Sequence, residues 1–326
     1  MVEDDVDVVL VTQLPADSWI EGLAVRPNNH ILAASLAEPV VYNIDAEDPD
    51  AVPEPVCTFP GVGAALNLCP IPGRSDEYSV ITSEISDVVT ARWETFAVWH
   101  MKVNADGSAV ATKMGDVPDI VLALGLCPIT ERFILVADSA RTCIQCLDVT
   151  TGKSTVLLAD DESMKAKDAE AFFGVNRVCI VDGYIWYSNY SVGSIHRVPY
   201  ELDESHPELP LRITGPVEMM TDDLSHCDGF QVLPDASAAY TINYMEGTLV
   251  KTVLKKDTQS MQIMDKLVSP TGVEMGKGPD GKPKLFVVCC GEIEVGWLND
   301  SVSWKDIANI AATTVEVTVS SDQESP

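Results

Sequence analysis

Basic residues are scarce in this sequence. Lys and Arg together number 21, against 50 Asp and Glu, and the formal net charge is −29 at pH 7. A protein that binds nucleic acid or an anionic membrane surface needs cations that displace the counterions of phosphate groups. We therefore expect no nucleic-acid partner, and we interpret the acidic surface as one that keeps the protein soluble.

Long apolar runs are also missing. The chain has no stretch of about 18 consecutive apolar residues, so we expect no membrane span. Its start, Met1 to Asp5, lacks the basic residues and the apolar run of a secretory signal. These features predict a cytoplasmic protein.

Cysteine is present without the spacing of a metal site. The nine cysteines are an odd number, and the lone CxxC of Cys143 and Cys146 has no second CxxC or histidine pair nearby. We interpret all nine as reduced thiols, mostly in the core. The sequence also has no phosphate-binding glycine loop and no GxSxG element, which argues against an α/β-hydrolase.

The sequence does contain a repeat. One template occurs six times: an apolar strand opener, a turn with Pro or Gly, a stronger strand, a turn of small residues and a third strand. The openers begin at residues 21, 64, 122, 176, 228 and 271. Their spacing is close to the roughly 40–50 residues of a four-stranded propeller blade.

This repeat predicts an all-β fold, a six-bladed β-propeller with four-stranded antiparallel blades that forms a single domain over residues 1–326. The strand-like runs Val6 to Thr12 and Thr314 to Val319 lie at opposite chain ends. Pairing them in one blade would close the ring and remove exposed edges. A β-sandwich is the alternative, but it does not explain the long period.

The first strand of each propeller blade lines the central channel, so the opener residues should meet at one rim, where any active site is expected. In ring order they are Glu21, Ala64, Leu122, Asn176, Asp228 and Thr271. Glu21 and Asp228 are the candidate general acids, because an apolar wall raises a carboxyl pKa. His226 is an alternative proton carrier, and Asn176 is a candidate hydrogen-bond donor to a developing oxyanion.

The candidate substrate-binding residues lie at or next to this rim. They are Trp19, Thr271, Asn189, Tyr190, Asn243, Tyr244 and Glu292. Structural roles compete with these functions: Asp228 before Gly229 could close a turn, Asn176 could cap loop amides, and His226 could be a loop histidine with local partners.

Glu21, Asn176 in Gly-Val-Asn-Arg-Val and Asp228 in Cys-Asp-Gly-Phe resemble the Glu/Asn/Asp metal triad of the senescence-marker-protein/gluconolactonase propellers. In that family a divalent cation is held by oxygen ligands and polarises a lactone. The resemblance implies Ca²⁺ or Mg²⁺ at these three residues and a lactonase activity. Leu122 departs from the pattern, since those enzymes tend to place an Asn there.

A closer resemblance is to intracellular fungal propellers of natural-product gene clusters. It rests on Leu14-Pro15, Trp19 to Asn28, Asp182 to Asn189 and Ser269 to Gly272. It implies a hetero-Diels–Alderase, a pericyclase that forms an o-quinone methide by dehydration and adds it to a terpene alkene such as a humulene. Such an enzyme takes apolar polyketide and terpene substrates and requires no cofactor. A non-catalytic propeller that binds a partner is the third hypothesis.

Overall fold

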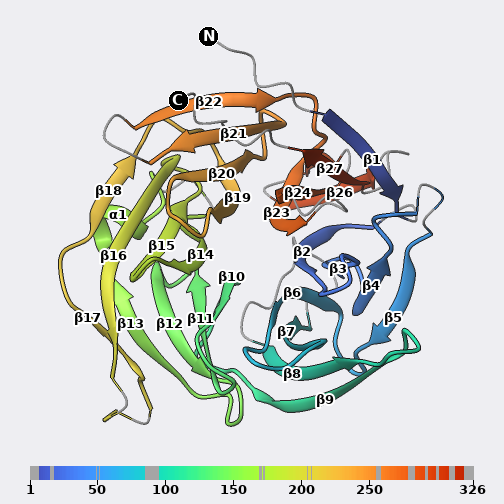
Figure 1. Cartoon of the computed structure of the whole chain (residues 1–326), viewed down its shortest axis with the longest axis horizontal. Helices are drawn as coiled ribbons and strands as arrows, with labels where there is room; N and C mark the ends of the chain where they lie inside the picture. Colours follow the sequence, from blue (N-terminus) through green and yellow to red (C-terminus); the bar gives the residue numbers. More distant parts are fainter. Residues whose placement is uncertain are drawn as a thin grey trace, which may run out of the picture.

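The computed structural model describes residues 7–14, 18–48, 50, 52–84, 95–168, 171, 173–203, 205–206, 208–254, 258–277, 283–290, 293–298, 301–307 and 313–318. In this part of the chain the strands form seven antiparallel sheets, and six of them surround one central axis, which confirms the predicted propeller (Figure 1). Five sheets have four strands, and the fourth blade has five. The one helix described, α1, is a single turn at Asp161–Met164.

The first three blades follow one another along the chain. The first contains β2 to β5, at Ile20–Val25, Ile31–Ser35, Val40–Ile44 and Glu54–Thr58. The second contains β6 to β9, at Ala64–Pro70, Glu77–Ser83, Phe96–Val103 and Ala109–Asp116. The third contains β10 to β13, at Ala123–Pro128, Phe133–Asp138, Cys143–Asp148 and Ser154–Ala159.

The other three blades complete the circle. The fourth contains β14 to β18, at Val175–Val181, Tyr184–Asn189, Ser194–Leu202, Leu211–Ile213 and Glu218–Thr221. The fifth contains β19 to β22, at Cys227–Val232, Ala238–Asn243, Thr248–Val253 and Gln259–Met264. The sixth contains β23 and β24, at Pro270–Lys277 and Pro283–Cys289, with β27 at Thr313–Thr318 and β1 at Asp7–Gln13. A separate hairpin is formed by β25 and β26, at Ile293–Leu298 and Ser301–Ile307.

The two ends of the chain close the ring in the predicted way. Strand β27 pairs with β24 on one side and with β1 on the other, so residues from both ends share the sixth blade. The inner strands then touch in the order β2, β6, β10, β14, β19, β23, and β23 returns to β2. The closed ring leaves the edges of the blades only at the outside of the molecule.

The hydrophobic core lies between neighbouring blades. Middle strands such as β3 and β11 are buried along their whole length, because each faces a sheet on both sides. One cluster joins Ile81 of β7 with Val136 of β11, and another joins Phe286 of β24 with Tyr42 of β4. Eight of the nine cysteines are buried, and Cys179 is partly buried.

Every inner strand has an irregularity in its pairing with the second strand, at the same level of the ring. The residues left unpaired there are Glu21, Leu66, Leu124, Asn176 with Arg177, Asp228 with Gly229, and Thr271. A bulge turns a residue out of the regular pleat, often next to a functional site. Alignment on the first apolar residue was wrong in two blades: the equivalents of Glu21 are Leu66 and Leu124, not Ala64 and Leu122. In these two blades the apolar run begins two residues before the bulge, so alignment on its first residue misses the bulge residue.

Candidate functional site

Arg177 lies at the centre of the ring of bulges. Its Nη2 atom is 2.9 Å from Oε1 of Glu21 and 3.4 Å from Oδ1 of Asp228, which come from the first and fifth blades. All three side chains are almost completely buried. We call this cluster of Glu21, Arg177 and Asp228 the neck of the channel.

Backbone carbonyls complete the surroundings of the guanidinium. Nη2 of Arg177 also donates to the carbonyl oxygens of Thr271 at 2.8 Å and Glu21 at 3.1 Å, and Nη1 donates to Leu124 at 2.6 Å. From the second blade, Asn67 Nδ2 donates to the same Leu124 carbonyl at 2.5 Å. These carbonyls belong to bulge residues, which the bulge releases from the strand ladder. One arginine therefore connects most blades of the propeller at the channel axis.

Two carboxyl groups share this one guanidinium. Burial raises the pKa of Asp228 well above its usual value, and the negative charge of Glu21 raises it further. Burial also raises the pKa of Glu21, although the charge and hydrogen bond of Arg177 and a hydrogen bond from Trp19 oppose the rise. Since one positive charge balances only one carboxylate in a dry site, Asp228 is the group that keeps its proton.

Several predicted site residues surround Asp228. Asn176 is buried and hydrogen bonded to the Asp228 carboxyl, while its own Oδ1 atom has no partner. Tyr190 and Tyr244 lie close enough that the charge of Asp228 contributes to raising the pKa of each phenol, after burial. Together with Trp19, which contacts Glu21, these residues give the acid a largely aromatic surrounding.

His226 lies further out than predicted. Its side chain is 40% exposed, and Nδ1 is 3.0 Å from Ser225 Oγ and 3.3 Å from Oε1 of Glu246. Its ring also packs against Tyr190, with 5.4 Å between the ring centroids. The histidine thus has local partners, and no described contact joins it to the neck.

Other predicted residues are committed to the fold. Asn189 is fully buried and its amide donates to the carbonyls of Ser163 at 2.9 Å and Lys165 at 2.8 Å, so its assignment to substrate binding is corrected. The Thr271 hydroxyl likewise donates to the Ile20 carbonyl at 2.6 Å, so its proton is used within the fold.

Two further assignments remain to be placed. Asn243 ends β20, is almost completely buried, and its Oδ1 atom has no hydrogen-bond partner. No described contact joins Asn243 to the neck. Glu292 lies outside the described residues.

The neck does not fit the divalent cation that the lactonase resemblance implies. Glu21, Asn176 and Asp228 do converge, but the guanidinium of Arg177 occupies the position between the two carboxyl groups. Within the described ranges, no group of three or more His, Cys, Asp or Glu side chains is arranged to hold a metal ion. The arginine supplies the positive charge that a metal would otherwise supply to these two carboxyl groups.

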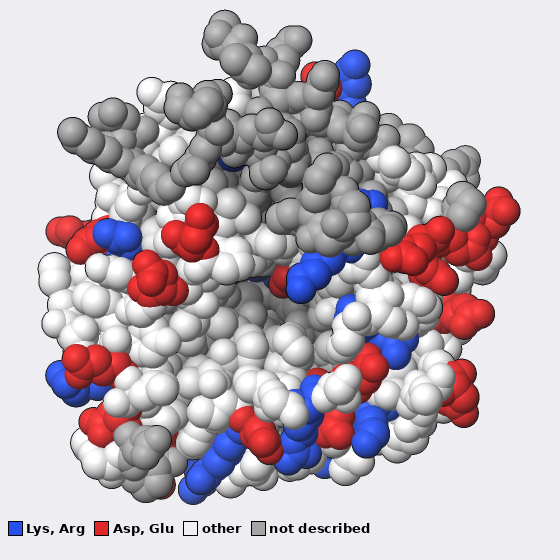
Figure 2. All heavy atoms as spheres, viewed as in Figure 1, with Lys and Arg blue, Asp and Glu red and all other residues white. Residues whose placement is uncertain are grey.

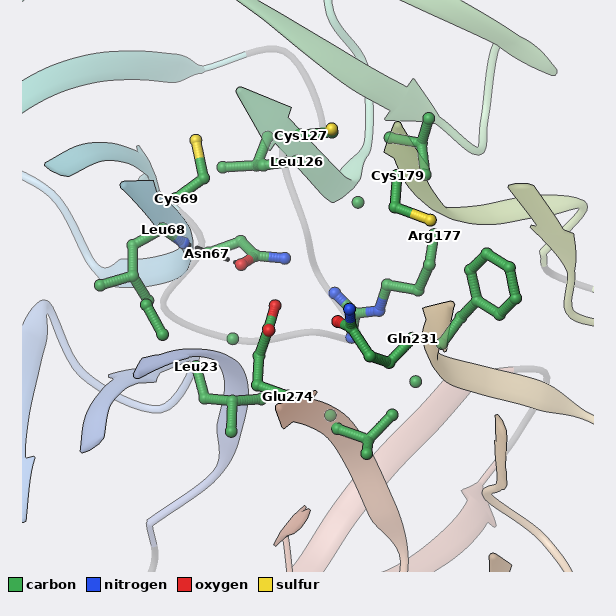
Figure 3. Close-up of a pocket in the computed structure, with 18 of the residues that line it drawn as sticks. Leu23, Asn67, Leu68, Cys69, Leu126, Cys127, Arg177, Cys179, Gln231 and Glu274 are labelled. Carbon is green, nitrogen blue, oxygen red and sulfur yellow. Dashed lines mark hydrogen bonds between the residues drawn. The ribbon is translucent and has the colours of Figure 1, made fainter. Parts of the chain in front are cut away.

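A cavity of about 380 Å³ lies next to the neck. Glu21 and Arg177 line it, whereas Asp228 does not. It starts at Glu21 and Arg177 and follows the inner strands toward their ends, away from the predicted rim (Figure 3). Most of the side chains that line it are apolar, but polar atoms form nearly half of the exposed wall, and the polar ends of Asn67, Gln231 and Glu274 point into it. The face in Figure 2 is hollowed near its centre, and acidic side chains lie around its circumference.

Sequence reasoning missed Arg177, Asn67 and Glu274. Arg177 follows Asn176 directly. Four other blades have glycine at the equivalent position of the inner strand, so a long cationic side chain there is the signal that could have identified it. Glu274 stands inside an otherwise apolar strand opener, where an ionised carboxylate needs a partner.

Comparisons with known proteins identify the fold. No protein-family model matches the chain, and no curated protein matches it. Similar solved structures include virginiamycin B lyase from Staphylococcus aureus, with 12% identity, a TM-score of 0.53, and coverage of 97% of this chain and 100% of that one. The apo-form soluble aldose sugar dehydrogenase from Escherichia coli has 14% identity, a TM-score of 0.56, and coverage of 97% and 100%. At such identities these likenesses show a propeller fold and nothing finer.

One more finding concerns membranes. None of the helices in the described ranges has the length and apolar character needed to span a lipid bilayer.

Proposed function

We propose that this propeller is a cyclase, a hetero-Diels–Alderase of fungal secondary metabolism, with Asp228 as its general acid. The observation that carries the proposal is the shared guanidinium at the neck. Arg177 neutralises Glu21 at 2.9 Å, while Asp228 at 3.4 Å is raised in pKa by burial and by Glu21. A carboxyl group whose pKa is raised is the kind of acid that the dehydration step needs.

The proposed reaction starts from a benzylic-type alcohol with a neighbouring phenol. The Asp228 carboxyl donates its proton to the benzylic hydroxyl, the C–O bond breaks and water leaves. The phenol O–H then returns its proton to the Asp228 carboxylate, which leaves a neutral o-quinone methide and regenerates the acid. Because Arg177 is held beside both carboxyls, it stabilises the transient negative charge on Asp228.

The second step joins the o-quinone methide to a terpene alkene. One C–C bond and one C–O bond form, and no proton is transferred. The protein contributes by holding the two partners in register and excluding water. Trp19, Tyr190 and Tyr244 provide the aromatic surfaces on which a planar quinone methide can stack.

The test is a mass-spectrometric assay of the purified protein with a benzylic-alcohol precursor and humulene. Asp228→Asn should slow dehydration by about 100-fold or more, as removal of a general acid does. Asp161→Asn, at a carboxylate that is 73% exposed, is the matched control and should keep full activity. Supplying a quinone methide formed chemically in the assay should bypass the acid, so that Asp228→Asn retains stereoselective addition. Wild-type rates and product ratios equal to the buffer background would refute the proposal.

A further inference from the structure

The cavity below the neck has the size of a small-molecule site. Its volume of about 380 Å³ lies within the range of small-molecule sites, roughly 300–1,000 Å³. Inner strands from all six blades line it, and most of the lining side chains are apolar, among them Leu23, Leu68, Leu126 and Val273, although nearly half of the exposed wall is polar. The cavity therefore favours a ligand with an apolar body.

Glu274 is the acid inside this cavity. Its carboxyl points into the open space, toward Asn67 and the channel axis (Figure 3). In the part of the chain that the structure describes, no Lys, Arg or His forms an ion pair with it, and the backbone N–H of Met275 is its hydrogen-bond donor. Burial raises the pKa of Glu274 to about 7, against the lowering effects of that hydrogen bond and of Arg177.

The other charges and titratable groups around Glu274 are accounted for. Arg177 is balanced by Glu21 at 2.9 Å, and its guanidinium is further occupied by backbone carbonyls. Three thiols face the cavity, Cys69, Cys127 and Cys179, and burial raises the pKa of each, so all three stay neutral at physiological pH. Glu274 is thus the one charge in the described cavity wall that still lacks a counter-charge.

We infer that the cavity binds a small apolar molecule that carries one primary ammonium group, with the ammonium on Glu274 and the carboxamide oxygens of Asn67 or Gln231 beside it. Charge complementarity selects the ammonium, since it supplies the missing counterion. The apolar wall selects the rest of the molecule. The formal net charge of −29 also draws cations toward the protein. This inference does not depend on the proposed cyclase activity.

The experiment compares two probes of the same shape, 2-phenylethylammonium and 2-phenylethanol, by isothermal titration calorimetry or ligand-detected NMR. A primary ammonium stays charged up to about pH 10, as a lysine side chain does, so within the pair of ammonium and Glu274 only the carboxyl titrates between pH 5.5 and 8. With a Glu274 pKa of about 7, ammonium binding should strengthen roughly thirtyfold from pH 5.5 to pH 8. Binding of the alcohol should change less than twofold.

Variants locate the site. Glu274→Gln should remove the pH dependence and the preference for the ammonium while it leaves alcohol binding unchanged, which also reports that the cavity is intact. Glu246→Gln changes an acid beside His226, outside the cavity wall, and should bind both probes as the wild type does. Leu126→Trp fills the cavity and should block both probes.

Four outcomes would overturn the inference, three of them seen with the wild type or Glu274→Gln. These three are ammonium binding that is independent of pH in the wild type, an unchanged ammonium preference in Glu274→Gln, and no binding of either probe at millimolar concentration. Binding of the probes that survives Leu126→Trp would place them elsewhere on the protein and would also overturn it. Cyclase activity is not a readout in any of these arms.

Discussion

Arg177 donates a hydrogen bond of 2.9 Å to Glu21, although 156 residues separate the two in the chain. The contact crosses the channel axis from the fourth blade to the first. It forms because both residues leave the regular pairing of their inner strands at the same level. Arg177 is thus both part of the site and a cross-link that holds the centre of the propeller together.

Replacement of Arg177 by methionine should destabilise the protein strongly. Methionine fills a similar volume, but it leaves the Glu21 carboxylate without a counter-charge and the carbonyls of Leu124 and Thr271 without their donors. Breaking a buried ion pair by removing one partner costs about 3–5 kcal/mol. Urea unfolding at pH 7 measures the loss.

Arg212→Met is the control for this prediction. Arg212 pairs with Glu201 at 2.6 Å, but both side chains are more than half exposed, at 60% and 63%. Exposed pairs contribute about 0–1 kcal/mol, so the control should change little. Equal losses in the two variants would contradict the role given to Arg177.

Asp228→Asn should make the protein more stable than the wild type as the pH rises. The folded-state pKa of Asp228 is raised by burial and by Glu21, so the folded protein binds a proton that the unfolded chain releases above about pH 4. Wild-type stability therefore falls with rising pH from there, by about 1.4 kcal/mol per pH unit, until the folded-state pKa is reached. Asparagine cannot titrate, so the stability of Asp228→Asn does not fall with pH for this reason.

Unfolding of both proteins at pH 4.5, 5.5 and 6.5 tests this prediction. The difference in unfolding free energy between Asp228→Asn and the wild type should grow across the series, because only the wild type loses the contribution of the protonated Asp228. A difference that stays constant with pH would mean that Asp228 is already ionised in the folded protein, and would remove the acid from the proposed reaction.

The blades and the closure of the ring could be predicted from the sequence because they depend on local patterns. Strand, turn and strand recur with a long period. The strand-like runs at the two chain ends are left over from the six repeats, so they were expected to pair with each other in one blade. The equivalence of residues within the ring was predicted correctly for Glu21, Asn176, Asp228 and Thr271, each of which is a bulge residue.

The neck could not be derived in the same way. A bulge shifts the register by one or two residues without changing the apolar pattern, so Leu66 and Leu124 were missed as equivalents. The role of Arg177 depends on the reach of its side chain across the channel to carbonyls of other blades. That reach is set by how closely the inner strands approach one another, and no single strand encodes it.

Gly125→Ala should show how closely the inner strands β10 and β14 approach each other. A Cβ atom at Gly125 would lie 2.7 Å from Cα of Arg177 and 2.7 Å from the carbonyl oxygen of Asn176, both of them backbone atoms that cannot move aside. Such overpacking costs about 1–3 kcal/mol. Gly115→Ala is the matched control, because its nearest neighbour would be an ordinary 3.4 Å away. Urea unfolding that finds the two variants equally stable would contradict the tight packing of β10 against β14.

Leu14→Ala should reveal how much the N-terminal segment contributes to closing the ring. Leu14 directly follows β1, is 2% exposed and packs with Ile20 and Phe286 between the sixth and first blades. Removal of a buried leucine side chain to Ala costs about 2–5 kcal/mol, the range reflecting how far the site collapses.

Leu10→Ala is the control in the same segment, since Leu10 is 60% exposed and its replacement should change the stability by no more than about 0.5 kcal/mol. Both are read from urea unfolding midpoints. If the two substitutions destabilised the protein equally, or if neither did, the N-terminal segment would not be anchored in the core between these blades, and β1 would be a dispensable outer strand.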